Sequence, residues 1–86
     1  MILLVSYDLK GPAGSYTSLF EALKKGGWAH YMKSTWFVAT DKTPDQLVDE
    51  LRPHLKSGDR ILISKLGTNQ GLLPKAAWEW MKRHES

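Results

Sequence analysis

Asp8 is the residue of this sequence that is best placed for chemistry, because it lies at the carboxyl end of a predicted strand, shortly before the turn residues 11–14. Side chains of a strand alternate between its two faces, so Asp8 shares a face with Leu4 and Ser6. We expect the more apolar face to pack against helices, which leaves Asp8 on the open face of the sheet. A two-fold dimer would bring a second Asp8, and two carboxylates with waters and a phosphate can hold Mg²⁺. Asp8 is therefore the candidate catalytic and metal-binding residue.

Asp8 also has a plain structural interpretation. An aspartate before a glycine turn commonly caps that turn by accepting hydrogen bonds from its backbone, as in an Asx turn. The spacing alone leaves both roles open. Ser6 and Lys10, which flank Asp8, are secondary candidates, and Lys10 fits either a phosphate contact or an ordinary solvated lysine. Together with Ser34 they are the predicted nucleic-acid contacts.

Other patterns in the chain carry weaker signals. The turn 11–14 can offer backbone N–H groups to an anion, but it lacks the lysine of a phosphate-binding P-loop, which favours a plain strand-to-helix turn. Glu50 and His54 have the spacing of a helical metal chelate, but Pro53 disturbs that turn, which favours a solvated face. Neighbouring aromatic residues at 36–37 can stack bases, yet no RNA-binding sheet motif accompanies them, which favours packing.

Apolar periodicity predicts four strands and three helices. Strands are expected at residues 2–9, 28–32, 35–40 and 60–66. Ser15 is the expected N-cap of the first helix, and residues 43–46 give the second helix a capping box with a proline at its first position. Pro53 should loosen the last turn of that second helix. A third, short helix is expected at residues 75–84.

The predicted order is β-α-β-β-α-β followed by a terminal helix, the order of ferredoxin-like folds. We therefore predict an α+β class, with an antiparallel sheet that carries two helices on one face, in a single domain over residues 1–86. The open face needs cover, from a second protomer or from the tail. In the tail, Trp80 shares a helix face with Ala77 and Met81, whereas Trp78 points elsewhere.

Composition is that of a small globular domain, with 42% hydrophobic and 24% charged residues in 86. A net charge of +3 permits nucleic-acid contact and equally fits ordinary solubility. The absence of cysteine excludes disulfides and thiolate zinc sites, and it fits a cytoplasmic location. The longest apolar run, residues 1–5, is too short for a membrane span, so no membrane contact is expected. Four tryptophans in so small a chain indicate an interface, and we expect a homodimer.

Several motifs together resemble those of a known family. They are the strand Val5–Leu9 with its Tyr7-Asp8 end, the strand Ser34–Val38, the segment Gly58–Ile63, and the tail with Gly71–Pro74, Ala77, Trp78 and Trp80. The chain resembles the CRISPR-associated Cas-two family and its relatives, which include the VapD-type toxins. The tail is most similar to that of the small bacterial SinR-like proteins.

The resemblance implies a ferredoxin-like homodimer with the two sheets opposed across the two-fold axis. It implies that Asp8 and its symmetry mate bind a divalent metal, with Mg²⁺ between the two protomers. Cleavage of RNA or DNA, or a structural role on DNA, are the activities that the resemblance implies. Two features depart from the family. Residues 15–22 contain no basic side chain where the family has arginines, and a helix with tryptophans replaces an additional strand.

Three functional hypotheses follow. The first is a homodimeric metal-dependent endoribonuclease that acts through Asp8. The second is a non-catalytic dimer that binds RNA or DNA with the same face, which the loss of the basic helix favours. The third is a toxin or regulator whose partner is another protein.

Overall fold

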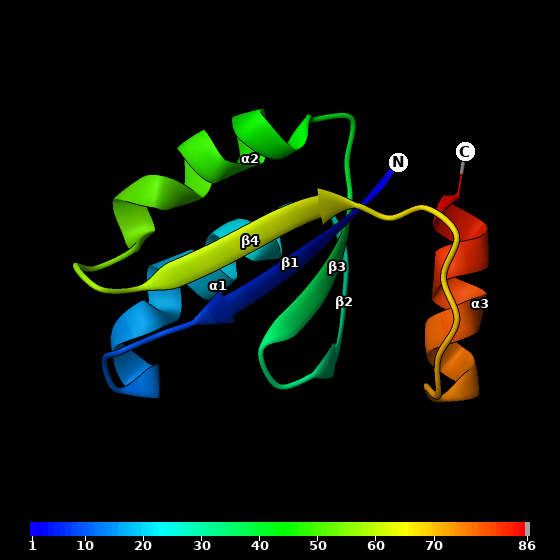
Figure 1. The fold of residues 1–86 in the computed structure, drawn as a ribbon, viewed down its shortest axis with the longest axis horizontal. Coiled ribbons are helices and arrows are strands. Elements are labelled where there is room, and N and C mark those ends of the chain that lie inside the picture. The colour runs from blue at the N-terminus through cyan, green and yellow to red at the C-terminus, as the bar shows by residue number, and fades with distance from the viewer. Residues whose placement is uncertain (86) are drawn as a thin grey trace.

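The structure is a computed structural model that describes residues 1–85. An antiparallel sheet of four strands forms its middle (Figure 1). The strands lie in the order β2-β3-β1-β4, so β1 is central and pairs with β3 and β4. The elements are β1 (Ile2–Asp8), η1 (Ala13–Tyr16), α1 (Thr17–Leu23), β2 (Gly27–Met32), β3 (Thr35–Ala39), α2 (Pro44–Leu51), η2 (Arg52–His54), β4 (Arg60–Lys65) and α3 (Lys75–His84). The expected α+β class and the antiparallel sheet are confirmed.

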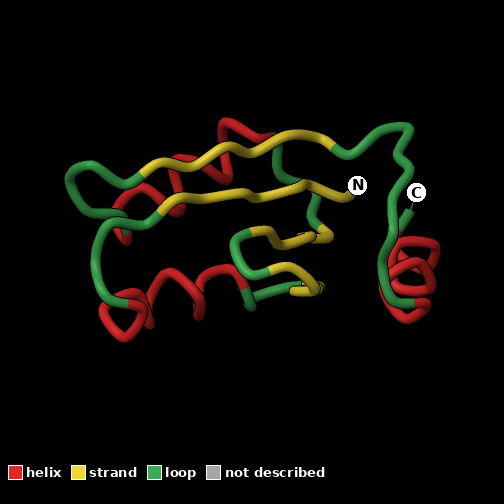
Figure 2. Tube along the Cα trace, turned by 60° about the horizontal axis from the view of Figure 1, so that its bottom comes forward, coloured by secondary structure: helices red, strands yellow, loops and turns green. Residues whose placement is uncertain are grey.

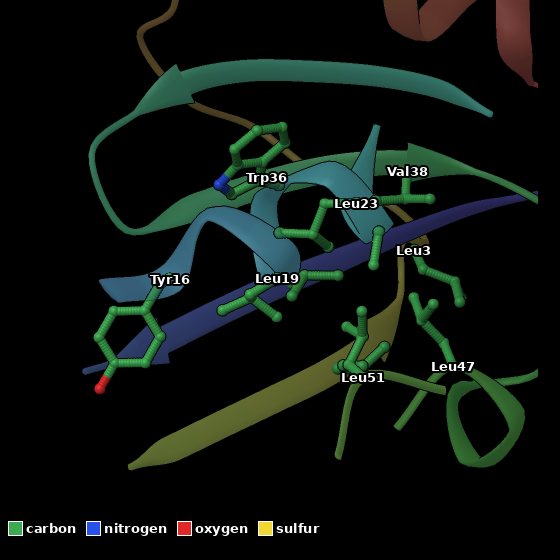
Figure 3. Packing of buried hydrophobic residues seen from close by; sticks show 11 residues of the cluster. Leu3, Tyr16, Leu19, Leu23, Trp36, Val38, Leu47 and Leu51 are labelled. Carbon is green, nitrogen blue, oxygen red and sulfur yellow. The ribbon is translucent and has the colours of Figure 1, made fainter. Parts of the chain in front are cut away.

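Helices α1 and α2 cover one face of the sheet and enclose the larger core. Leu3 and Val5 of β1 are fully buried there, as strand alternation predicted. Figure 3 shows this packing, with Leu19 and Leu23 of α1 and Leu47 and Leu51 of α2 among the buried side chains. In Figure 2 the third helix stands apart from these two, near the end of the sheet where the chain begins.

The second helix begins as predicted. The Thr43 hydroxyl accepts a hydrogen bond from the Gln46 N–H (3.3 Å), and the Gln46 side chain accepts one from the Thr43 N–H (2.9 Å). α2 ends at Leu51, and the chain continues as the 3₁₀-helix η2, which contains Pro53. Proline has no backbone donor, and the loosened last turn is therefore confirmed.

The first helix differs from the prediction at its start. Ser15 is not its N-cap, because α1 begins only at Thr17 and the Ser15 hydroxyl donates to the Pro12 carbonyl (2.6 Å) inside η1. The tighter 3₁₀ turn delivers Tyr16 to the core, where its side chain is fully buried. Burial of Tyr16 thus decides the local structure at a position where capping propensity indicated a helix start.

Helix α3 packs on the opposite face of the sheet and forms the smaller core. Trp80 is 8% exposed and its ring lies 6.4 Å from that of Phe37 on β3, with Ile2, Ala29 and Met81 in the same cluster. The predicted burial of Trp80 beside Met81 is confirmed. No helix in residues 1–85 is long and apolar enough to cross a membrane.

Cover by α3 extends over one half of this face only. The smaller core contains the start of β1, whereas Leu62 of β4, which is paired with Ser6, stays 65% exposed. Trp28, which is 40% exposed, lies on the other face of the sheet, where its ring is 5.3 Å from that of buried Trp36. Half of the face predicted to be open is therefore available for contact.

Trp80→Ala should reduce the free energy of unfolding by about 3–5 kcal/mol, the usual range when a buried tryptophan is truncated. The large loss is expected because Trp80 links α3 to Phe37 and Ile2. Urea denaturation followed by circular dichroism measures the change. Leu72→Ala, at a fully exposed apolar position, is the matched control and should change stability by less than about 0.5 kcal/mol. Equal stability of the wild type and the Trp80 variant would show that α3 does not contribute to the fold.

Candidate functional site

Asp8 lies at the end of β1, on the half of the sheet face that α3 leaves uncovered. In the sheet register it stands opposite Arg60, the first residue of β4. Its carboxylate forms an ion pair with the Lys10 ammonium (3.7 Å), and the two side chains are 66% and 59% exposed. Asp8 is thus accessible to solvent and is accompanied by positive charge.

The other predicted contact residues gather at the same end of the sheet. Ser6 shares the face of Asp8, and its hydroxyl accepts a hydrogen bond from Thr35 (3.4 Å). Ser34 lies in the turn between β2 and β3, where its carbonyl accepts a hydrogen bond from the N–H of Tyr7 (3.0 Å). The structure therefore brings Ser6, Asp8, Lys10 and Ser34 to the same end of the sheet.

The loop after β1 is held by a different aspartate. Asp59, directly before β4, accepts hydrogen bonds from the N–H of Lys10 (2.8 Å), the N–H of Lys56 (2.7 Å) and the hydroxyl of Tyr16 (2.8 Å). The Tyr16 hydroxyl in turn accepts the Gly11 N–H (3.0 Å). Within residues 1–85, the Asp8 carboxylate accepts no such backbone hydrogen bond. The structural interpretation of Asp8 as an Asx cap is therefore wrong.

This network changes the acidity of its two titratable members. Desolvation acts to raise the pKa of Asp59, but the hydrogen bonds from Lys10, Lys56 and Tyr16 outweigh it, so the pKa lies below its ordinary value. The pKa of Tyr16 is raised, chiefly by burial and further by the neighbouring Asp59 carboxylate, although the Gly11 N–H acts against the shift. Asp59 is accordingly a charged acceptor at neutral pH, and Tyr16 is a neutral donor.

Four basic residues lie on the segments at this end of the sheet. Lys10 follows β1, Lys33 lies in the turn between β2 and β3, and Lys56 and Arg60 lie before and at the start of β4. All four residues are exposed. The ion pair and the sheet register place Lys10 and Arg60 beside Asp8, whereas the Lys56 ammonium lies over the Tyr16 ring (4.7 Å). The arrangement fits an anion such as a phosphate better than it fits an isolated cation.

One protomer offers a metal ion at Asp8 a single carboxylate. In the sheet register Asp8 is the single acidic residue on its face. No group of three or more histidine, aspartate or glutamate side chains in residues 1–85 is arranged to hold a metal ion. Mg²⁺ prefers several oxygen ligands in octahedral geometry, so a site at Asp8 would require the carboxylate of a second chain.

No protein-family model matches this chain, and no curated protein matches it either. The resemblance to Cas-two-like proteins therefore stays a hypothesis carried by short motifs of the sequence.

Glu50 and His54, the pair with the spacing of a helical metal chelate, each contact other residues. Glu50 pairs with Lys42 and with Lys25 (3.7 Å), and the hydrogen bond from Lys42 is the main reason that its pKa is lowered. His54 Nδ1 instead shares a hydrogen bond with the Ser18 hydroxyl of α1 (3.0 Å). Glu50 and His54 thus have different partners, contributed by different parts of the chain.

Sequence reasoning missed Asp59, the residue that organises the loops beside the site. Its partners Tyr16 and Lys10 are 43 and 49 residues away along the chain, so no local pattern connects them. The local signal in the sequence was the glycine before Asp59. Gly58 has a φ of +87°, a conformation that glycine adopts readily. It lies in a turn that is closed by a hydrogen bond from the Asp59 N–H to the Lys56 carbonyl. A Ser-Gly-Asp turn before a strand marks such an acceptor.

Asp59→Asn should lower the melting temperature at neutral pH, because three donors lose a charged acceptor. A carboxylate with a lowered folded pKa stabilises the protein above its unfolded value of about 3.9. That contribution is lost as the pH falls through the folded pKa, so the wild type and the variant should converge in acid. Calorimetry from neutral to acidic pH measures the difference.

Asp8→Asn is the matched control for this experiment, measured without divalent cations. Asp8 has one exposed ion pair, and such pairs contribute little to stability. The melting temperature of this variant should therefore stay at the wild-type value across the pH range. A loss as large as that of Asp59→Asn would show that Asp8 also supports the loop.

Proposed function

We propose that this chain is a homodimeric, Cas-two-like protein that binds nucleic acid at the Asp8 end of its sheet. The observation that carries the proposal is the pair of exposed basic residues, Lys10 and Arg60, beside an accessible Asp8 on the uncovered half of the sheet. Positive charge of this kind binds phosphates, and the neighbouring apolar surface offers a contact for a second copy.

The topology supports the finer fold assignment, a ferredoxin-like fold. The elements follow one another as β-α-β-β-α-β, and α3 comes after the last strand. A 3₁₀ turn precedes α1, and another follows α2. β1 and β4 are neighbours, β3 is on the other side of β1, and α1 and α2 share one face of the sheet. This arrangement agrees with the fold that the resemblance implies.

The surface beside Asp8 supports a homodimer. Leu62 projects from β4 with 65% of its surface exposed, and Met32 of β2 is 41% exposed on the same sheet face. A two-fold axis near this half of the sheet would bury both apolar side chains and bring the two Asp8 residues toward each other. It would also join the basic residues of the two protomers into one larger surface.

Cleavage of RNA is the second candidate function. It is favoured by the finding that Asp8 takes no part in holding the loop, although it occupies the end of the central strand. Two Asp8 carboxylates in a dimer offer oxygen ligands of the kind that Mg²⁺ prefers. When bound, the metal would polarise the scissile phosphate and activate a water.

Leu62→Asp should convert the dimer into a monomer, because it places a charge in the proposed apolar contact. Sedimentation equilibrium at micromolar concentration should give twice the chain mass of 9.8 kDa for the wild type and the chain mass for the variant. Leu72→Asp, a charge at a fully exposed leucine in the segment before α3, should remain a dimer. A monomeric wild type would remove the shared-metal hypothesis and the dimer together.

Lys10→Ala/Arg60→Ala should weaken the binding of a short single-stranded RNA by tenfold or more. Each phosphate contact contributes about 0.7 to the slope of log affinity against log salt, so two lost contacts should reduce that slope by about 1.4. Fluorescence anisotropy at several salt concentrations measures both quantities. Lys75→Ala/Arg83→Ala, which removes the same charge from α3, is the control and should bind like the wild type. Equal losses in both variants would indicate general attraction without a site.

The same RNA distinguishes the two candidate functions. With Mg²⁺ or Mn²⁺ the endoribonuclease hypothesis expects the wild type to cut the RNA and Asp8→Asn to bind it without cutting. Binding without cutting in both proteins supports the non-catalytic module. Cutting that persists in purified Asp8→Asn places the activity outside Asp8. Absence of both binding and cutting contradicts both functions and favours a protein partner.

A further inference from the structure

The hairpin of β2 and β3 carries an exposed indole on the sheet face that α1 and α2 cover. The register pairs Trp28 with Val38 of the larger core, which places Trp28 on that face, and 40% of its surface is exposed. β2 is at the edge of the sheet, so no other strand of residues 1–85 pairs with its outer side. Trp36 and Phe37, the neighbouring aromatic residues of the sequence, are instead buried. Trp28 is therefore an aromatic ring that is open to contact.

The buried ring of Trp36 holds two exposed rings in place. The His30 imidazole stacks on the Trp36 indole, with 4.0 Å between the centroids and 12° between the planes, and His30 is exposed. The Trp28 indole lies 5.3 Å from the same ring at a tilt of 45°, so the two indoles do not cover each other as a parallel pair would. Trp36 is itself fixed, because its indole N–H donates to the Tyr7 hydroxyl (3.0 Å). The exposed rings are thus preorganised and need little ordering when a ligand binds.

The turn between β2 and β3 is tied to these rings. The His30 Nε2 lies 3.0 Å from the Lys33 carbonyl, and it donates because a carbonyl only accepts. The Tyr7 hydroxyl donates to the same carbonyl (3.3 Å). Two hydrogen bonds therefore hold the turn, and with it Lys33, next to the aromatic residues.

The charge around the rings is positive. The Lys24 ammonium lies 5.1 Å from the Trp28 ring centroid and 6.0 Å from that of Trp36. Residues 24–40, which contain the whole hairpin, include three lysines and no aspartate or glutamate. Among residues 1–85, neither Lys24 nor Lys33 has a carboxylate within 4.0 Å. Aromatic rings beside ammonium groups that no carboxylate neutralises are complementary to a ligand that combines flat rings with negative charge.

We propose that this surface binds single-stranded nucleic acid, with a base stacked on Trp28 and the adjacent phosphate at Lys24. A single strand offers open base faces, whereas a duplex keeps them inside its own stack. Every base has such a face, so binding should depend little on the base sequence. The proposal rests on nucleic-acid binding as the proposed function, and it adds a base contact on the face of the sheet opposite to Asp8.

Trp28→Ala should weaken the binding of a short oligouridine by about 5–150-fold, the effect of losing one stacked base. Trp28→Phe keeps an aromatic face and should restore most of the affinity. Leu72→Ala removes an exposed apolar side chain elsewhere and should bind like the wild type. Fluorescence anisotropy measures these affinities, and circular dichroism checks that each variant is folded.

An abasic strand of the same length is the matched ligand, because it keeps the phosphates and lacks the bases. Trp28→Ala should leave the binding of this strand unchanged. Lys24→Ala should weaken the binding of both strands and reduce the slope of log affinity against log salt by about 0.7, the value of one phosphate contact.

Three results would overturn the proposal. The first is equal affinity of the wild type and Trp28→Ala for oligouridine. The second is an equal loss for oligouridine and the abasic strand, which would show that Trp28 supports the fold and contacts no base. The third is a dimer that Trp28→Ala converts into a monomer in sedimentation equilibrium, which would assign the surface to a second copy of the chain.

Lys10→Ala/Arg60→Ala distinguishes failure of this proposal from failure of the proposed function. If these substitutions weaken oligouridine binding and Trp28→Ala does not, nucleic acid binds at the Asp8 end alone and the hairpin proposal is wrong. If only Trp28→Ala weakens it, the hairpin proposal is supported and the Asp8 end is not the binding site. Absence of oligouridine binding by the wild type contradicts both.

Discussion

The central strand β1 is apolar on both of its faces at its start, and the arrangement of the molecule follows from the need to cover both. Leu3 and Val5 point to α1 and α2, whereas Ile2 and Leu4 point to the opposite side. A sheet with two apolar faces needs two layers of cover, which is demanding for 86 residues. The chain meets this demand with two helices on one side and the single helix α3 on the other.

Because α3 is short, it covers only the half of its face near the start of β1. Trp80 fills the space above Phe37 and Ile2, and the sheet beyond Leu4 carries the polar side chains of Ser6 and Asp8. The uncovered half therefore coincides with the polar end of β1. The same constraint that stabilises the sheet thus leaves Asp8 accessible and leaves Leu62 exposed beside it.

The two aspartates at this end of the sheet have divided roles. Asp59 binds the loop after β1 and the Tyr16 hydroxyl, so the loop is stable without help from Asp8. Asp8 keeps only its ion pair with Lys10. A side chain that contributes little to folding is free to serve binding or catalysis, and this division is the physical basis of the proposed function. On helix α3, Trp80 is buried in the smaller core and Trp78 packs against the same core while remaining half-buried.

The sequence by itself determined the elements and the faces of β1, because strand alternation, helix caps and proline effects act over a few residues. The capping box at Thr43, the loosened turn at Pro53 and the burial of Trp80 were all predictable in this way. Only the tertiary structure decided which aspartate holds the loop, since Asp59 and Tyr16 are 43 residues apart. It also decided that burial of Tyr16 overrides Ser15 as a helix cap. Such contacts depend on how distant segments pack, which no local pattern records.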